Sequence, residues 1–393
     1  MSSRFFEYLQ YFTLQKVFKF LNVNIYFLLF RGGCKLLSDN LYPVFNSHYY
    51  PKYANWEMTL RCNMNCLHCG SKAGKARKNE LSESECIDIA NQLIRMGNEQ
   101  ITLIGGEILL VPFWFKIAKI FADAGVYVNI ITNGFNVGRK QIEEIKKSGI
   151  RNVYVSIDGL QKNHDIIRNR IGSFDRVIKA IKLIQQTGLQ VGVTTTILDI
   201  NFGDLEGMYR LFHSLNIAFW QLQIAAPMGR CVTQRNALLN PKKMDLIVEF
   251  IYKKRKLGGT PIVLASDNIG YFCKFDINLR SMDLNQPSHF IGCAAGLFNI
   301  GIDSVGNVRG CESLYSDEFI EGNLRRESLE SIWNKKNAFA YNRQFKLSML
   351  NGKCKNCDKG NICAGGCRQL SYFSSGGNHF YDNIYCNYKR ENV

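Results

Sequence analysis

Three cysteines, Cys62, Cys66 and Cys69, follow one another at C-x3-C-x2-C spacing, directly after the strand-like run 56–60. A loop this short can place three thiolates around one face of a metal cluster, but it supplies no fourth cysteine. Thiolates suit zinc and iron–sulfur clusters, and a structural zinc site needs four ligands. His68 could supply the fourth ligand, but it lies between two cysteines and would strain the loop. The loop favours an iron–sulfur cluster with one open iron over a zinc knuckle or free thiols.

A second group of cysteines occupies the C-terminal part of the chain. Seven thiolates are enough for one four-ligand site and most of another, and a zinc ribbon is the alternative interpretation. The group consists of Cys293, Cys311, Cys354, Cys357, Cys363, Cys367 and Cys386. The isolated Cys34, Cys231 and Cys273 are predicted to be buried thiols.

The composition of the chain limits the cellular compartments and the classes of partner that can be expected for it. Fourteen cysteines in 393 residues would suit a disulfide-rich secreted protein, but the N-terminus lacks the ordered features of a signal peptide. Clustered C-x2-C spacings without such a signal favour metal sites in a reducing cytoplasm. The formal charge of +16 is compatible with nucleic acid, anionic lipid or an acidic substrate. Because no nucleic-acid-binding motif accompanies it, no nucleic-acid partner is expected.

The elements that must position the first cysteine loop alternate between strands and helices. Strands are predicted at 57–60, 100–104, 126–132, 152–157, 190–197 and 219–224, and helices are predicted to begin near Ser82, Pro112, Val137, Ser173 and Gly203. Ser82 and Glu85 form the pattern of a capping box. Six β/α repeats predict an α/β fold in which a parallel sheet curls into a partial barrel. Active sites of such folds gather at the C-terminal ends of the strands.

Three short motifs fall at those strand ends. Gly105-Gly106-Glu107 follows the second strand, and its glycines would let the backbone approach a ligand closely. Thr132-Asn133-Gly134 closes the third strand, and Ser156-Ile157-Asp158-Gly159 ends the fourth, with Arg168 twelve residues after Ser156. An arginine can pair with a carboxylate through two hydrogen bonds. Each motif alone is compatible with an ordinary turn.

Together, the cysteine loop and these motifs resemble the radical S-adenosylmethionine (SAM) enzymes. The resemblance implies a partial (β/α)6 barrel in which Cys62, Cys66 and Cys69 hold a [4Fe–4S] cluster whose open iron chelates SAM. One electron would cleave SAM to methionine and a 5′-deoxyadenosyl radical. Ile108 stands where the family usually has proline after Gly-Gly-Glu. By the same resemblance, the SAM-binding residues are Gly105, Gly106, Glu107, Asn133, Ser156, Arg168 (with Arg170 as the alternative arginine) and Leu222, the last expected near the adenine.

The C-terminal cysteine order resembles the SPASM domain of peptide-modifying radical SAM enzymes. The runs 322–324 and 328–333 match it as well. The resemblance implies a small α+β domain with two auxiliary [4Fe–4S] clusters that transfer electrons. The first would be bound by Cys293, Cys311 and Cys367, and the second by Cys354, Cys357, Cys363 and Cys386. The first cluster is one ligand short, so either Cys273 completes it or the site is open or has a non-cysteine ligand.

The chain is therefore expected to have four parts. Residues 1–50 form an amphipathic segment rich in aromatic and basic residues, 51–230 the radical SAM core, 231–290 a bridging segment and 291–393 the SPASM domain. In the bridging segment, 244–256 is predicted to be an amphipathic helix with its basic run on the exposed side. The apolar run in the N-terminal segment is too short to span a bilayer. It would dock on protein or lie at a membrane interface, which gives a cytoplasmic, membrane-associated protein as one option.

The resemblance predicts a radical SAM/SPASM maturase that abstracts a hydrogen from a peptide or protein, leading to a cross-link, an epimer or an oxidation. A low-potential electron donor of the flavodoxin or ferredoxin type would supply the electron. The alternative enzyme is an anaerobic sulfatase-maturing type that generates formylglycine, with Glu312, next to Cys311, as its catalytic base. A non-enzymatic iron–sulfur electron carrier is the third interpretation.

Overall fold

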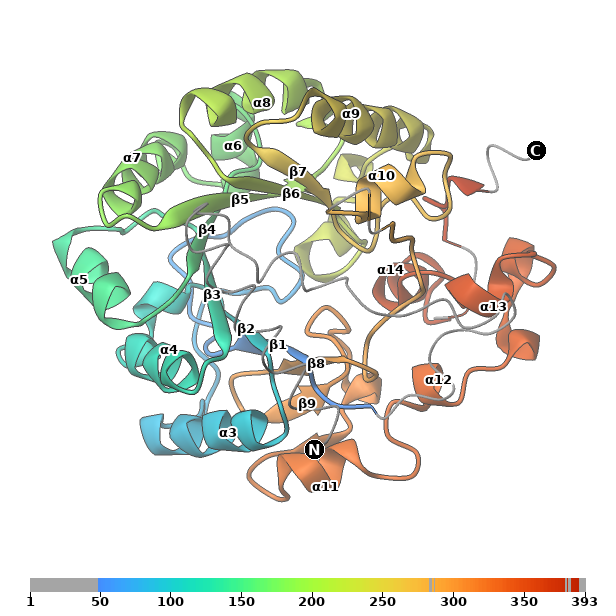
Figure 1. The fold of residues 1–393 in the computed structure, drawn as a ribbon, viewed down its shortest axis with the longest axis horizontal. Coiled ribbons are helices and arrows are strands. Elements are labelled where there is room, and N and C mark those ends of the chain that lie inside the picture. Colours follow the sequence, from blue (N-terminus) through green and yellow to red (C-terminus); the bar gives the residue numbers. More distant parts are fainter. Residues whose placement is uncertain (1–48, 283–284, 286, 379, 381–382, 389–393) are drawn as a thin grey trace, which may run out of the picture.

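The computed structural model describes residues 49–282, 285, 287–378, 380 and 383–388. The predicted amphipathic N-terminal segment lies outside these residues, apart from its last two positions. One ten-stranded sheet runs through the molecule in the order β10-β9-β8-β1-β2-β3-β4-β5-β6-β7 (Figure 1). Its strands are β1 (Tyr53–Glu57), β2 (Gln100–Ile104), β3 (Tyr127–Thr132), β4 (Asn152–Ser156), β5 (Gln190–Ile197), β6 (Phe219–Ile224), β7 (Ile262–Ala265), β8 (Asn299–Ile302), β9 (Asn307–Arg309) and β10 (Gly322–Asn323).

The curved parallel part of this sheet is the predicted partial barrel. Strands β1 to β6 pair in chain order, all parallel, because each is followed by a helix that returns the chain along the outer face. These helices are α3 (Glu83–Arg95), α4 (Trp114–Asp123), α5 (Arg139–Lys147), α6 (Gln161–Arg168), α7 (Ser173–Gln185) and α8 (Leu205–Ser214). Figure 1 shows them in a ring around the strands. The partial (β/α)6 barrel is confirmed.

Two local predictions in the barrel need correction. The first strand was placed at 57–60, but β1 ends at Glu57, and the next residues form the start of the cysteine loop. The backbone pairing extends one residue beyond the strand, because Met58 donates its N–H to the Ile104 carbonyl at 2.9 Å. Helix α6 was not predicted. The predicted capping box is present, since Ser82 accepts from the Glu85 N–H and the Glu85 carboxylate accepts from the Ser82 N–H.

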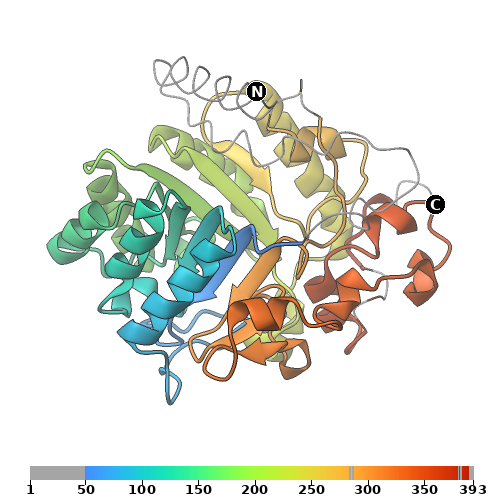
Figure 2. The same cartoon turned by 60° about the horizontal axis from the view of Figure 1, so that its bottom comes forward.

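The sheet continues beyond the six predicted strands at both edges. Strand β7, from the bridging residues, pairs in parallel with β6, while β8 pairs in parallel with β1 and aligns Gly301 with Asn55. Strands β9 and β10 then add in antiparallel fashion. The part of the chain that carries the second cysteine group is thus attached through backbone hydrogen bonds to the first strand of the barrel. Figure 2 shows β8 and β9 lying beside β1.

The remaining helices cover the bridging and C-terminal residues. They are α9 (Met244–Leu257), α10 (Asp276–Arg280), α11 (Leu329–Trp333), α12 (Ala340–Arg343), α13 (Gly360–Cys363) and α14 (Arg368–Ser374). Helix α9 confirms the prediction for 244–256, except that its basic run is not wholly exposed. Arg255 turns inward and donates to the carbonyls of Val263, at 3.2 Å, and Ser281. Of the helices in the described residues, none is sufficiently long and apolar to cross a bilayer.

The core behind the sheet is continuous from α3 to α10. Trp56, Trp114 and Trp220 are fully buried in it, and the indole of Trp220 donates to Thr195 Oγ1 at 2.8 Å. The opposite, concave face of the strands carries polar side chains instead. This difference between the two faces leaves an interior that can hold a polar ligand.

Candidate functional site

The three cysteines of the first loop line a cavity of about 680 Å³ on the concave side of the sheet. This volume is in the range of small-molecule sites. The structure brings most of the predicted SAM-binding residues to the same cavity. Those that line it are Gly105, Gly106, Asn133, Ser156 and Arg168, together with Thr194 and Thr196 on β5.

Backbone contacts to Gly105 and Gly106 fix the cysteine loop. Gly106 donates its N–H to the Thr59 carbonyl at 2.6 Å, and Glu107 donates to the Arg61 carbonyl at 2.8 Å. A Cβ atom at Gly106 would lie 2.3 Å from the Arg61 oxygen. Only glycine therefore allows the end of β2 to lie against the residue that precedes Cys62.

Glu107, which is expected to bind SAM, lies behind the wall of the cavity. It is 3% exposed and does not line the cavity. Its carboxylate accepts from Thr132 Oγ1 at 2.6 Å and from the Asn133 N–H at 2.8 Å. Asn133 then donates to Asn63 Oδ1 at 2.7 Å. Glu107 thus ties the end of β3 to the cysteine loop, although burial raises the pKa of its carboxyl.

Arg168 lines the cavity and forms a buried ion pair. Its Nη2 lies 2.7 Å from Asp158 Oδ2, and its Nη1 lies 3.7 Å from the Cys66 sulfur. His68 Nε2 lies 3.4 Å from the same Asp158 oxygen, so its ring faces the carboxylate. Burial lowers the pKa of His68 to about 4, which keeps the ring neutral. The alternative residue, Arg170, is exposed and donates to the Asn63 carbonyl outside the cavity.

The prediction for Leu222 placed the wrong face of β6 at the site. Its side chain is fully buried in the core, whereas Gln221 and Gln223 on either side of it line the cavity. Side chains alternate between the two faces of a strand. Leu222 therefore points away from the cavity, and the glutamines on either side of it point into the cavity.

The thiols of the second cysteine group interact within two sets. Burial raises the pKa of the Cys311 thiol, which also interacts electrostatically with Glu312, Cys293 and Cys367. The thiol of Cys363 interacts in the same way with Cys354, Cys357 and Cys386. Tyr271 lies between the two sets, since it interacts with both Cys367 and Cys363, and its hydroxyl accepts from the Cys367 N–H at 3.3 Å.

Cys273 occupies a different environment. It is 5% exposed and belongs to the apolar core. A Cβ atom placed on Gly270 would lie 3.7 Å from the Cys273 sulfur, and it would also contact the side chains of Leu279 and Val248. The structure therefore places this thiol among α9 and α10.

Glu312 reaches the cavity from the loop after β9. Its backbone packs so tightly on β8 that a Cβ atom at Gly301 would lie 2.3 Å from the Glu312 nitrogen. Its carboxylate accepts from Ser313 Oγ at 3.4 Å and interacts with the Asn55 side chain on β1. Burial raises the pKa of this carboxyl above its ordinary value.

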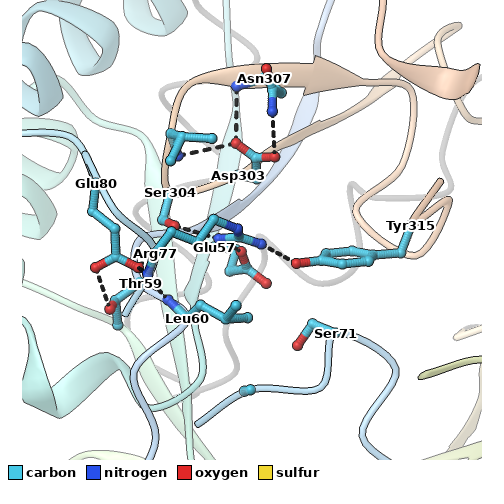
Figure 3. A network of polar contacts seen from close by, with 12 residues as sticks. Glu57, Thr59, Leu60, Ser71, Arg77, Glu80, Asp303, Ser304, Asn307 and Tyr315 are labelled. Carbon is cyan, nitrogen blue, oxygen red and sulfur yellow. Dashed lines mark hydrogen bonds and ion pairs between the residues drawn. The ribbon is translucent and has the colours of Figure 1, made fainter. Parts of the chain in front are cut away.

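A polar network that the sequence did not reveal borders the same cavity (Figure 3). Arg77 donates from Nη1 to Glu57 Oε1 at 2.6 Å, and it also donates to Ser304 Oγ and to the Tyr315 hydroxyl. Glu57 and Tyr315 line the cavity. No spacing signal marks these residues, because they come from β1, the loop after the cysteines, and two loops of the C-terminal part.

The residues present fit a cluster-bound SAM. Three thiols line the cavity, and several buried polar atoms around it lack a hydrogen-bond partner, among them His68 Nδ1, Arg168 Nε and Thr194 Oγ1. Such atoms normally have partners, so a polar ligand would satisfy them. Within the described ranges, no three His, Cys, Asp or Glu side chains converge as they would around a single metal ion.

Comparison with known families decides the assignment. The model of the radical SAM superfamily matches residues 56–212, and that of the SPASM iron–sulfur cluster-binding domain matches residues 293–358. The chain belongs to the radical SAM superfamily. This radical SAM enzyme also carries a SPASM domain, and both family models describe proteins that bind iron–sulfur clusters, in the first case together with SAM.

Relatives of this radical SAM enzyme have different activities. An AdoMet-dependent heme synthase from Methanosarcina barkeri is 26% identical over 86% of this chain and 97% of the synthase. The mycofactocin maturase MftC from Mycobacterium tuberculosis is 26% identical over 82% of this chain and 80% of the maturase. Both enzymes are covered along most of their length.

Solved structures share the fold. SuiB from Streptococcus suis, bound to S-adenosylmethionine, superposes with a TM-score of 0.70 at 16% identity, over 87% of this chain and 79% of SuiB. The enzyme anSMEcpe, with AdoMet and a peptide, superposes with a TM-score of 0.67 at 19% identity, over 86% of this chain and 94% of that enzyme.

Proposed function

We propose that this enzyme abstracts a hydrogen atom from a residue of a peptide or protein in the described cavity, and that the product is a cross-link, an epimer or an oxidised residue. When bound, the cluster and SAM supply a 5′-deoxyadenosyl radical for this step. Cys62, Cys66 and Cys69 would hold the cluster. Gly105, Gly106, Asn133, Ser156 and Arg168 would contact SAM, with Glu107 positioning Asn133.

The observation that carries the choice of a peptide is the chemistry of the cavity lining. It is rich in carboxamide groups, which donate and accept hydrogen bonds as a peptide backbone does. These come from Asn55, Gln100, Asn133, Gln221, Gln223, Asn268, Asn299 and Gln369.

The charges of the lining also favour a peptide over a substrate with several carboxylates. The lining contains three arginines and four carboxyl groups. Arg168 and Arg309 are paired with Asp158 and Asp303, and Arg230 donates to backbone carbonyls of the cysteine loop. A polyanionic tetrapyrrole, as the heme synthase relatives would suggest, would find little free positive charge here. The maturase relatives agree with the peptide.

We further propose two auxiliary [4Fe–4S] clusters. Cys293, Cys311 and Cys367 would hold the first, with a non-cysteine ligand or an open iron, and Cys354, Cys357, Cys363 and Cys386 the second. Low-potential clusters in a row suit electron transfer, and a flavodoxin- or ferredoxin-type protein would be the donor. Glu312 faces the cavity next to Cys311, so it would accept a proton from the substrate. The same position would serve a formylglycine-generating enzyme, which is the second candidate function.

The test is anaerobic reconstitution followed by iron and sulfide analysis and an assay for 5′-deoxyadenosine from SAM and dithionite. Cys66→Ala is expected to abolish 5′-deoxyadenosine. Cys231→Ala is the matched control, because this buried thiol contacts the same loop through the Leu67 carbonyl, at 3.7 Å, and lies outside the cavity lining. About twelve irons per chain would agree with three four-iron clusters. SAM cleavage that survives Cys66→Ala would refute the proposal.

A second assay separates the substrate classes. Candidate peptides encoded near the gene, a sulfatase-type cysteine peptide and iron-coproporphyrin are each incubated with the reconstituted enzyme and SAM, and the products are analysed by mass spectrometry. A mass change in a peptide supports the proposal, and a change in the cysteine peptide alone supports the second candidate function. Decarboxylation of the porphyrin with no change in any peptide would overturn the peptide assignment.

A further inference from the structure

The polar network of Figure 3 holds a phenol at the edge of the reaction cavity. Arg77, from the loop after the cysteines, donates to Glu57 on β1 and to Tyr315, four residues after Cys311. Both Glu57 and Tyr315 line the cavity that contains the three cysteines. The phenol therefore shares a compartment with the proposed SAM site and belongs to the loop of a proposed auxiliary-cluster ligand.

The surroundings of Tyr315 hold the ring in place and leave its hydrogen available. Guanidinium groups flank the ring, with Arg309 at 5.4 Å and Arg77 at 5.8 Å from its centroid. Because Arg77 is a donor in its bond to the hydroxyl, the phenolic hydrogen is not used there. Burial, assisted by the nearby Glu57 carboxylate, raises the pKa of the phenol above its ordinary value. The hydroxyl thus keeps its proton at neutral pH.

A carbon radical on the substrate can end in two ways: it can lose an electron, which gives an oxidised product or a cross-link, or it can gain a hydrogen atom. A phenol is a good hydrogen-atom donor because the resulting phenoxyl radical is delocalised over the ring. We propose that Tyr315 is a catalytic residue that donates a hydrogen atom to the substrate carbon radical, so that the enzyme's reaction class is epimerisation. This inference rests on the proposed function and selects among its outcomes.

The step balances with groups that the proposal names. The phenolic O–H bond breaks and a C–H bond forms on the substrate, which leaves a phenoxyl radical. One electron, which a cluster held by the Cys311 loop would supply, and one proton would then restore the phenol. Glu57 would supply the proton, since burial raises its pKa to about 7 and it is partly protonated at neutral pH. Arg77 positions both groups.

Deuterium transfer tests the donor before the peptide is known. The reconstituted enzyme is turned over with SAM and dithionite in D2O, without peptide or added thiol, and the deuterium content of 5′-deoxyadenosine is measured. Exchangeable phenolic deuterium is expected in the product of the wild type and of Tyr154→Phe, whose ring is buried outside the cavity lining. Tyr315→Phe is expected to lose most of this deuterium while 5′-deoxyadenosine still forms.

The opposite results overturn different statements. Deuterium that is absent in the wild type, or undiminished in Tyr315→Phe, would overturn the role of Tyr315 alone. Absence of 5′-deoxyadenosine from all three proteins would overturn the proposed function and this inference with it.

A second measurement needs neither cluster nor SAM. Hydroxyl radicals oxidise accessible aromatic rings whether or not the hydroxyl is protonated, so the metal-free protein is expected to be oxidised at Tyr315 far more than at Tyr154, as peptide mapping would show. Tyr315 that stays unmodified under conditions that oxidise Tyr53, the other tyrosine of the lining, would overturn its placement at the cavity.

Discussion

Replacement of Gly106 by alanine tests how the barrel holds the cysteine loop. The new Cβ atom would lie 2.3 Å from the Arg61 carbonyl oxygen and 2.6 Å from that of Leu60. Both atoms belong to backbone, so no side chain can rotate away. The loop must retreat by roughly 0.7 Å before the nearer contact reaches the 3.0 Å below which Cβ contacts are essentially never found. The perturbation therefore acts on the residue that precedes Cys62.

The expected cost follows from the contacts that this retreat disturbs. Overpacking costs about 1–3 kcal/mol, and weakening of the hydrogen bonds from Gly106 and Glu107 to the loop adds about 0.5–1.5 kcal/mol each. We expect Gly106→Ala to lower the free energy of unfolding by about 2–4 kcal/mol, on the same principles. We also expect the reconstituted variant to lose the iron of one cluster and to bind SAM more weakly.

The assays are urea denaturation of the metal-free protein, iron analysis and equilibrium binding of SAM. Gly74→Ala is the matched control, since Gly74 lies in the same loop region, pairs with Arg61, and has no atom within 4 Å of its Cβ position. If Gly106→Ala matched this control in stability, iron content and SAM affinity, the close approach would not be what fixes the cysteine loop.

Two further predictions concern buried groups. Burial raises the pKa of Glu57 from 4.5 to about 7, so the folded state binds more protons than the unfolded state between these values, and stability falls as pH rises through that window. Glu57→Gln should remove up to about 3 kcal/mol of this decline, measured by urea denaturation at pH 5 and pH 8; an unchanged pH dependence would contradict it. Cys273→Ala should keep the iron content of the wild type because its thiol lies in the apolar core, whereas Cys367→Ala should lose iron; iron loss in Cys273→Ala would show that this thiol is a ligand.

Much of the barrel was predictable because its signals are local. The strands at Gln100–Ile104, Gln190–Ile197 and Phe219–Ile224 were predicted with their observed bounds, since runs of apolar and β-branched residues between polar turns mark buried parallel strands. The first strand was misplaced because the strand-like alternation of apolar and polar residues in 56–60 continues after the pairing with β2 has ended at Glu57. The parallel pairing of β8 with β1 left no local signal, as the two strands are far apart in the chain.

The cysteine spacings, taken together with the short motifs at the strand ends, predicted the chemistry of the site. Three thiols in one short loop and seven in a fixed order identify cluster binding, because ligand type and spacing are properties of the chain. Which other side chains meet the thiols was decided only by the tertiary structure. Arg77, Tyr315, Glu57 and Glu312 come together because β8 closes against β1 and brings the loop after Cys311 to the cavity. That closure depends on contacts such as Gly301 against Glu312, and no periodicity or spacing in the sequence encodes such long-range packing.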